Sequence, residues 1–175
     1  DDPATGEVAL FLELVTDMRG LDPSGTHLDQ PAADIDEILR ALAGWQAAFW
    51  GADERRLAWA GPRPTTADMM ADAPLWRAIV DHGRKRMPTV VTEEVWRRRH
   101  RLIDTIDEWH AIKDALPATL AHNDFNPRNV GFRRGVLVLD WELATRNTAQ
   151  RDLVEMLTFG LRPSVDRARV DRHVE

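Results

Sequence analysis

A short polar segment in the second half of the chain carries the side chains best suited to chemistry. Residues 122–129 include Asp124 and Asn129, and Asp140 follows two short apolar runs further along. If those runs fold as a hairpin, the three side chains come together at its base. Carboxylate and amide oxygens, completed by phosphate oxygens, are ligands that Mg²⁺ prefers. The spacing therefore predicts a magnesium site beside a small hairpin.

The three side chains also allow a division of roles. A carboxylate that stays off the metal can accept a proton from a substrate hydroxyl, and we assign this role of general base to Asp124. Asn129 and Asp140 are then the expected metal ligands. Each of these three residues also has a purely structural interpretation, because Asp and Asn are common in turns and often stabilise loops through hydrogen bonds.

Apolar periodicity predicts the elements that position these side chains. Helical spacing indicates helices over 32–50, 67–82, 92–116 and 150–161. Apolar runs indicate short strands at 8–12, 130–132 and 136–139. Residues 17–30 are expected to form a loop, and 120–129 are dense in polar residues. Gly135 is expected to supply left-handed backbone in the tight turn of the hairpin. The expected fold class is α+β and mainly helical.

Composition narrows the class of protein. The 175 residues suit one domain or one lobe of a larger protein, and no apolar run is long enough for a membrane-spanning helix. The formal net charge of −6 argues against a nucleic-acid partner held by phosphate contacts. The chain has no cysteine, which excludes disulfides and thiolate sites, and the cytoplasm is the expected compartment.

The motif His122-x-Asp124-x-x-Pro127-x-Asn129, followed after a hairpin by Leu-Asp-Trp-Glu at 139–142, resembles the catalytic segment of the protein-kinase-like superfamily. Within it the chain is most similar to the aminoglycoside phosphotransferase and choline-kinase-like branch. The resemblance implies transfer of the γ-phosphoryl group of ATP, or alternatively GTP, to a small-molecule hydroxyl with the help of Mg²⁺.

The resemblance also implies a layout and further roles. Residues 1–16 would be a strand and hinge in which the backbone of Glu13 and Val15 contacts the nucleotide base, and 17–175 would be the helical catalytic lobe. The hairpin would carry the catalytic and metal-binding loops. Asn126 takes a position at which the superfamily has a phosphate donor, and Asp152 would brace the catalytic loop.

The sequence departs from the superfamily in several places. Asn123 replaces the Arg of regulated protein kinases, and only 11 residues separate Asp140 from Asp152, which disfavours a protein substrate. No glycine-rich loop or phosphate-gripping Lys precedes Glu7. We therefore expect a nucleotide-covering lobe upstream, a continuation beyond the C-terminus, and an inactive enzyme when this chain is isolated.

Two other functions remain open at this level. One is a kinase-like module that binds a nucleotide or a partner without catalysis, and the other is a magnesium-dependent phosphohydrolase using His122, Asp124 and Asp140. The acidic charge suits a cationic acceptor such as an aminoglycoside or an amino alcohol, while sugars and other alcohols also fit. The sequence predicts neither the acceptor nor the oligomeric state.

Overall fold

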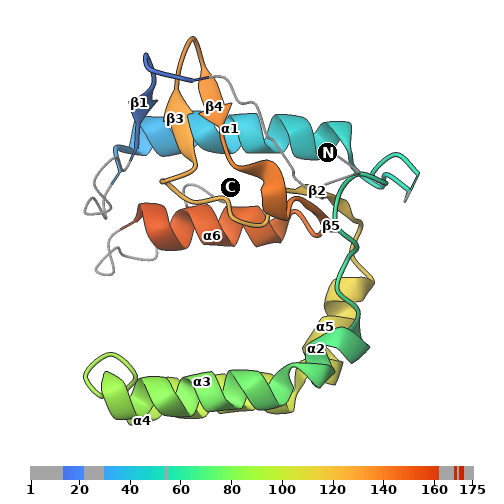
Figure 1. Ribbon diagram of the computed structural model, residues 1–175, viewed down its shortest axis with the longest axis vertical. Helices are drawn as coiled ribbons and strands as arrows, with labels where there is room; N and C mark the ends of the chain where they lie inside the picture. Colours follow the sequence, from blue (N-terminus) through green and yellow to red (C-terminus); the bar gives the residue numbers. More distant parts are fainter. Residues whose placement is uncertain (1–13, 22–29, 54, 162–167, 169, 172–175) are drawn as a thin grey trace, which may run out of the picture.

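The computed structural model describes residues 14–21, 30–53, 55–161, 168, 170 and 171. Figure 1 shows a lobe that contains the strands and the helices α1 (Ala32–Ala48) and α6 (Gln150–Gly160), and an arm made of further helices. The arm leaves the lobe on one side and turns back beneath α6. The fold class is α+β, as the sequence predicts.

The core of the lobe lies where α1 meets the hairpin and α6. Ile35, Ile38 and Leu42 recur at helical spacing on α1 and are buried against Phe125 and Met156. The predicted helix over 32–50 is confirmed to within two residues at its C-terminal end. There Gly51, with φ of 67°, donates its backbone N–H to the carbonyl of Ala118, which ties the end of α1 to the strand that precedes the polar segment.

A three-stranded antiparallel sheet contains the predicted hairpin. Strands β3 (Val130–Phe132) and β4 (Val136–Val138) pair antiparallel, with Val130 opposite Val138, and Gly135 takes a φ of 131° in the turn. Strand β1 (Arg19–Gly20) pairs with β3, so the prediction of an unbroken loop over 17–30 was wrong at these two residues. Gly131 permits this pairing, because a Cβ there would lie 2.8 Å from the carbonyl oxygen of Arg19.

A second, two-stranded sheet frames the polar segment. Strand β2 (Thr119–Ala121) pairs antiparallel with β5 (Thr145–Asn147), and a short 3₁₀ helix, η1 (Trp141–Leu143), lies between β4 and β5. Residues 120 and 121, at the start of the polar stretch 120–129, therefore belong to a strand. Both strands are too short for a periodic signal, and their pairing joins residues far apart in sequence.

The arm consists of α2 (Thr66–Ala71), α3 (Ala73–Arg86), α4 (Glu93–Asp104) and α5 (Ile106–Asp114). Each of the helices predicted over 67–82 and 92–116 is in fact two. Pro74 starts a new helix because it has no N–H to continue the previous one. Thr105 interrupts the second, and its hydroxyl donates to the carbonyl of Arg101, a contact that bends helices.

Polar contacts join the two long helices of the arm. The indole of Trp96 donates to Asp81 at 2.6 Å, His100 Nε2 lies 3.0 Å from the same carboxylate, and Arg77 pairs with Asp104 at 2.5 Å. Thr92 caps α4 by accepting from the N–H of Val95. No helix among the described residues is both long and apolar enough to cross a membrane.

Candidate active site

His122 fixes the polar segment to the end of the hairpin. Its side chain is fully buried, and its Nε2 lies 2.7 Å from the carbonyl oxygen of Leu139, the residue before Asp140. Nδ1 accepts the backbone N–H of Asp124, which assigns the proton to Nε2. Both ring nitrogens are thus used for structure, and His122 positions the residues on either side of the site.

Asp152, on the first turn of α6, braces the same loop from below, as the resemblance implies. Its two carboxylate oxygens accept the backbone N–H groups of His122 at 2.8 Å and Asn123 at 2.9 Å. Burial raises the pKa of this carboxyl group, against the opposing effect of the two N–H donors. The loop conformation, with φ of 68° at Asn123, is held by these contacts.

Arg151 is a second residue that holds the loop, and the sequence alone did not predict this role. Arg151 donates from Nε to the side-chain oxygen of Asn123 and from Nη2 to its backbone carbonyl, both at 3.1 Å, and from Nη1 to Glu155 at 2.5 Å. Burial raises the pKa of Glu155, and the charge of Asp124 acts in the same direction. The four-residue spacing of Arg151 and Glu155 was a signal for their pairing.

Asp124 is held by two amide groups. Asn129 Nδ2 donates to one carboxylate oxygen at 2.7 Å, and Asn126 Nδ2 donates to the other at 2.9 Å. Asn126 is itself buried, and its oxygen accepts the backbone N–H of Arg128. The carboxylate of Asp124 is therefore fixed in orientation while its residue stays partly accessible.

The hairpin brings the two predicted metal ligands to one place. The backbone N–H of Leu139 donates to the carbonyl of Asn129 at 2.8 Å, so that Asp140 follows directly beside Asn129. Asp140 is exposed and takes left-handed backbone, with φ of 61°. One amide oxygen and one carboxylate suit Mg²⁺ bound mainly by phosphates and water. Among the described residues, no group of three or more His, Asp or Glu could hold a metal.

The predicted hinge lies mostly beyond what the structure describes. Glu13 and the strand expected over 8–12 are outside the described residues. Val15 is half-buried and lies four residues before β1, which pairs with the hairpin strand β3. The predictions for nucleotide contact at Glu13, Val15 and Asn126 stay predictions.

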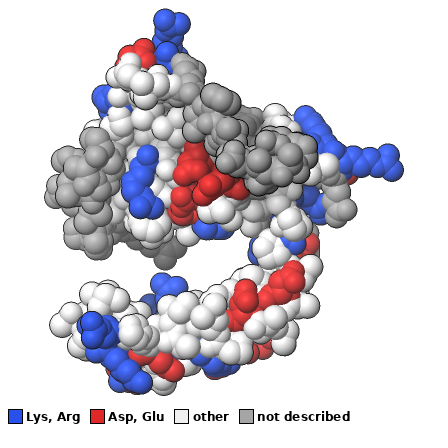
Figure 2. Space-filling model, in the orientation of Figure 1, with Lys and Arg blue, Asp and Glu red and all other residues white. Residues whose placement is uncertain are grey.

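Acidic side chains gather near the middle of the lobe, above the hollow that separates it from the arm (Figure 2). Asp124, Asp152 and Glu155 lie close enough to interact electrostatically. Such a field favours a divalent cation near Asp124 and Asp140.

Comparison with known proteins agrees with this geometry. The model of the phosphotransferase enzyme family (APH) matches residues 2–173. The chain belongs to the phosphotransferase enzyme family. A search of curated proteins finds no significant match. Family membership identifies the protein as a phosphotransferase in general and confirms the resemblance to the aminoglycoside phosphotransferase family.

Proposed function

We propose that this chain is the catalytic lobe of an ATP- or GTP-dependent phosphotransferase that moves the γ-phosphoryl group to a hydroxyl of a small molecule. The observation that carries the proposal is the carboxylate of Asp124, held at both oxygens by Asn126 and Asn129 beside the hairpin end that carries Asp140. A fixed, partly accessible carboxylate next to a magnesium donor pair is the arrangement that phosphoryl transfer requires.

Each residue has a distinct part in the reaction. Asp124 orients the acceptor hydroxyl and takes its proton as the acceptor oxygen bonds to the γ-phosphorus and the bond to the β-phosphate oxygen breaks. Asn129 and Asp140 would hold Mg²⁺, which neutralises charge on the phosphates when bound. The backbone of Glu13 and Val15 would contact the nucleotide base.

Two roles can be considered for Asn126, namely donating to a phosphate and positioning Asp124. The family resemblance puts Asn126 at a phosphate-donor position, whereas in the structure its amide group donates to Asp124. An amide already engaged in this way favours positioning of the base as its main contribution.

The test is an assay of the full-length gene product with Mg²⁺, ATP or GTP, and a pool of hydroxylated acids, amines, sugars and antibiotics. We expect a product heavier by one phosphoryl group, detected by mass spectrometry. Asp140→Asn should raise the Mg²⁺ concentration needed for half-maximal rate, whereas Asp107→Asn, an exposed carboxylate on α5, should leave it unchanged.

Two results would contradict the proposal. Release of phosphate from the nucleotide at the same rate with and without every acceptor would indicate a phosphohydrolase. Nucleotide binding without transfer to any member of the pool would indicate an inactive binding module.

A further inference from the structure

A cavity of about 480 Å³ lies where the arm meets the lobe, and it reaches the catalytic loop. Its arm side is formed by residues of α2 and α5, and its lobe side includes Asn123 and Arg151. Asn123 is the residue before Asp124, so a molecule in this cavity lies next to the proposed base. The volume is in the range of small-molecule sites. A larger cavity of about 670 Å³ has no catalytic-loop residue among the described residues that line it.

The walls of this cavity, which we call the junction cavity, are mainly apolar. Met69, Trp109 and Val154 contribute apolar surface, and the charged side chains among the described lining residues are Lys113 and Arg151. No Asp or Glu belongs to that described lining. A polycation would therefore meet apolar surface and like charge there, which is unfavourable.

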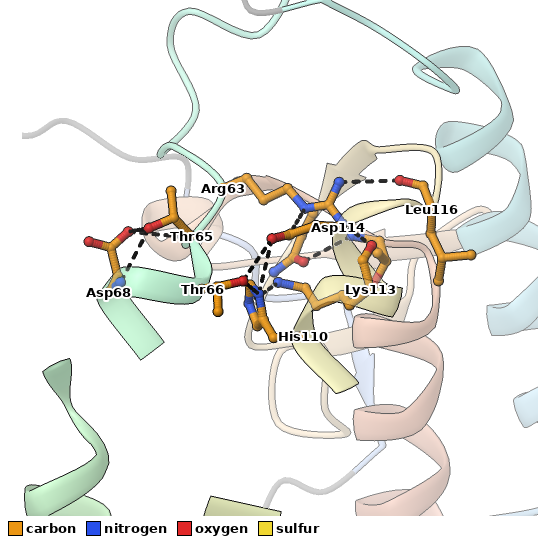
Figure 3. Close-up of polar contacts among 10 residues, drawn as sticks. Arg63, Thr65, Thr66, Asp68, His110, Lys113, Asp114 and Leu116 are labelled. Atoms are coloured by element: carbon orange, nitrogen blue, oxygen red, sulfur yellow. Dashed lines mark hydrogen bonds and ion pairs between the residues drawn. The ribbon is translucent and has the colours of Figure 1, made fainter. Parts of the chain in front are cut away.

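Arg151 is already engaged, which leaves Lys113 as the charge available to a ligand. The guanidinium of Arg151 is shared between Asn123 and Glu155. The ammonium of Lys113 donates to Nε2 of the buried His110 at 3.1 Å and has further donors to offer. The other ring nitrogen of His110, Nδ1, lies 2.9 Å from the Thr66 hydroxyl and 3.2 Å from the carboxylate of Asp114 (Figure 3).

The surroundings of Lys113 favour an added negative charge. Burial lowers the pKa of Lys113, and repulsion from Arg63 lowers it further, while Asp114 acts in the opposite direction. The carboxylate of Asp114 also contacts Arg63, whose Nε lies 3.5 Å from it, and His110 (Figure 3). An anionic group of a ligand would compensate the desolvated ammonium.

We propose, building on the function proposed above, that the junction cavity binds the body of the acceptor, and that this acceptor is an apolar alcohol carrying an anionic group that Lys113 recognises. The acidic field near Asp124 and Asp140 then serves the metal, and the cationic junction cavity serves the acceptor. The proposed acceptor is thus anionic, whereas the net charge of the chain had suggested a cationic one.

The experiment uses three alcohols that share one apolar body and differ in charge: 4-(hydroxymethyl)benzoate, its methyl ester, and 4-(hydroxymethyl)benzylamine. Binding to the full-length gene product is measured by isothermal titration calorimetry. We expect the acid to bind at least about tenfold more tightly than the amine, with the ester between them, because one charge-assisted hydrogen bond accounts for a difference of that size.

Two pairs of variants test whether Lys113 causes the preference for the acid and whether the alcohols bind in the junction cavity. Lys113→Met should abolish the preference for the acid, whereas Lys85→Met, an exposed lysine on α3, should keep it. Val154→Trp should fill the junction cavity and weaken binding of all three alcohols by about tenfold or more, whereas Phe159→Trp, exposed on the same helix, should not. Unchanged thermal melting confirms that each variant is folded, and the second pair tests the cavity independently of Lys113.

The inference is wrong if the amine binds as tightly as the acid, if none of the alcohols binds, or if folded Val154→Trp protein binds them as the wild type does. A different result separates the two proposals. If the acid binds as expected but no phosphorylated alcohol forms with nucleotide and Mg²⁺, the cavity assignment stands and the proposed transfer reaction does not.

Discussion

The proposed function gives different tasks to two carboxylates of the site, Asp124 and Asp152, and their hydrogen-bond partners differ accordingly. Asp124 accepts hydrogen bonds from the side-chain amides of Asn126 and Asn129, which fix its direction but leave it partly accessible. Asp152 is fully buried and accepts two backbone N–H groups, which makes it part of the framework. Residue type alone does not distinguish a base from a brace, whereas burial and donor type do.

The two amides that hold Asp124 are expected to differ in kinetic effect. Asn126→Ala should lower kcat by roughly tenfold or more and leave the Mg²⁺ requirement unchanged, because it removes one donor from the base. Asn129→Ala should lower kcat and also raise the Mg²⁺ requirement, because it removes a predicted metal ligand. Steady-state kinetics at a series of Mg²⁺ concentrations measures both kcat and the Mg²⁺ requirement of the two variants. An equal rise in Mg²⁺ requirement for both variants would contradict these roles.

Replacing the brace should destabilise the lobe. Asp152→Asn puts an NH₂ group in place of one of the oxygens that accept from His122 and Asn123, so that a buried backbone donor loses its partner. We expect the free energy of unfolding in urea to fall by about 1–3 kcal/mol. Asp107→Asn, on an exposed turn of α5, is the matched control. Equal stability of the two variants would show that the brace is dispensable.

At the scale of elements, the sequence predicts what is locally periodic and misses what depends on distant partners. Helix α1 and the β3–β4 hairpin were predicted because their apolar spacing and turn glycine are local signals. Strands β1, β2 and β5 were missed because two or three residues show no period and their partners are far away in sequence. Pro74 was a readable signal for the break between α2 and α3.

The same reasoning applies to the candidate site. The positions of Asp124, Asn129 and Asp140 beside one hairpin follow from the motif spacing, and the family match is consistent with it. The contacts of Arg151 with Asn123 could not be predicted, because they join α6 to a loop 28 residues earlier in the chain. The junction cavity could not be predicted either, because it forms only where the arm packs against the lobe.

The pairing of α3 with α4 should depend on one carboxylate. Asp81 accepts from Trp96 and faces His100. Little apolar burial supports these two helices, because Ile103 is their one buried residue among those described. Asp81→Asn should speed amide hydrogen exchange in α3 and α4 and leave α1 unchanged. Asp107→Asn is again the control. Unchanged exchange in α3 and α4 would mean that other contacts hold the pair.

At the scale of the whole molecule, arm and lobe should respond to acid in opposite directions. Hydrogen bonds from Trp96 and then His100 lower the pKa of Asp81, and the hydrogen bond from Arg84 lowers that of Glu93. Their stabilisation of the arm is present above about pH 4 and is lost as the pH falls through their folded pKa values. Burial raises the pKa of Asp152 and of Glu155, so their contribution to the lobe grows as the pH falls toward about 4.

Acidification should therefore loosen the arm before the lobe. Hydrogen exchange, corrected for intrinsic rates, should show loss of protection in α3 and α4 as the pH falls below about 4, while α1 and α6 stay protected. Loss of protection in α6 before α3 would contradict the assignment of these titrations.

The most direct test of the central claim is single-turnover phosphoryl transfer by Asp124→Asn in the full-length gene product, with the acceptor found in the pooled assay. The account predicts a fall in the transfer rate of roughly 10²- to 10⁴-fold, with nucleotide affinity and thermal melting unchanged. A transfer rate within about twofold of the wild type would contradict it, because Asp124 could not then be the base.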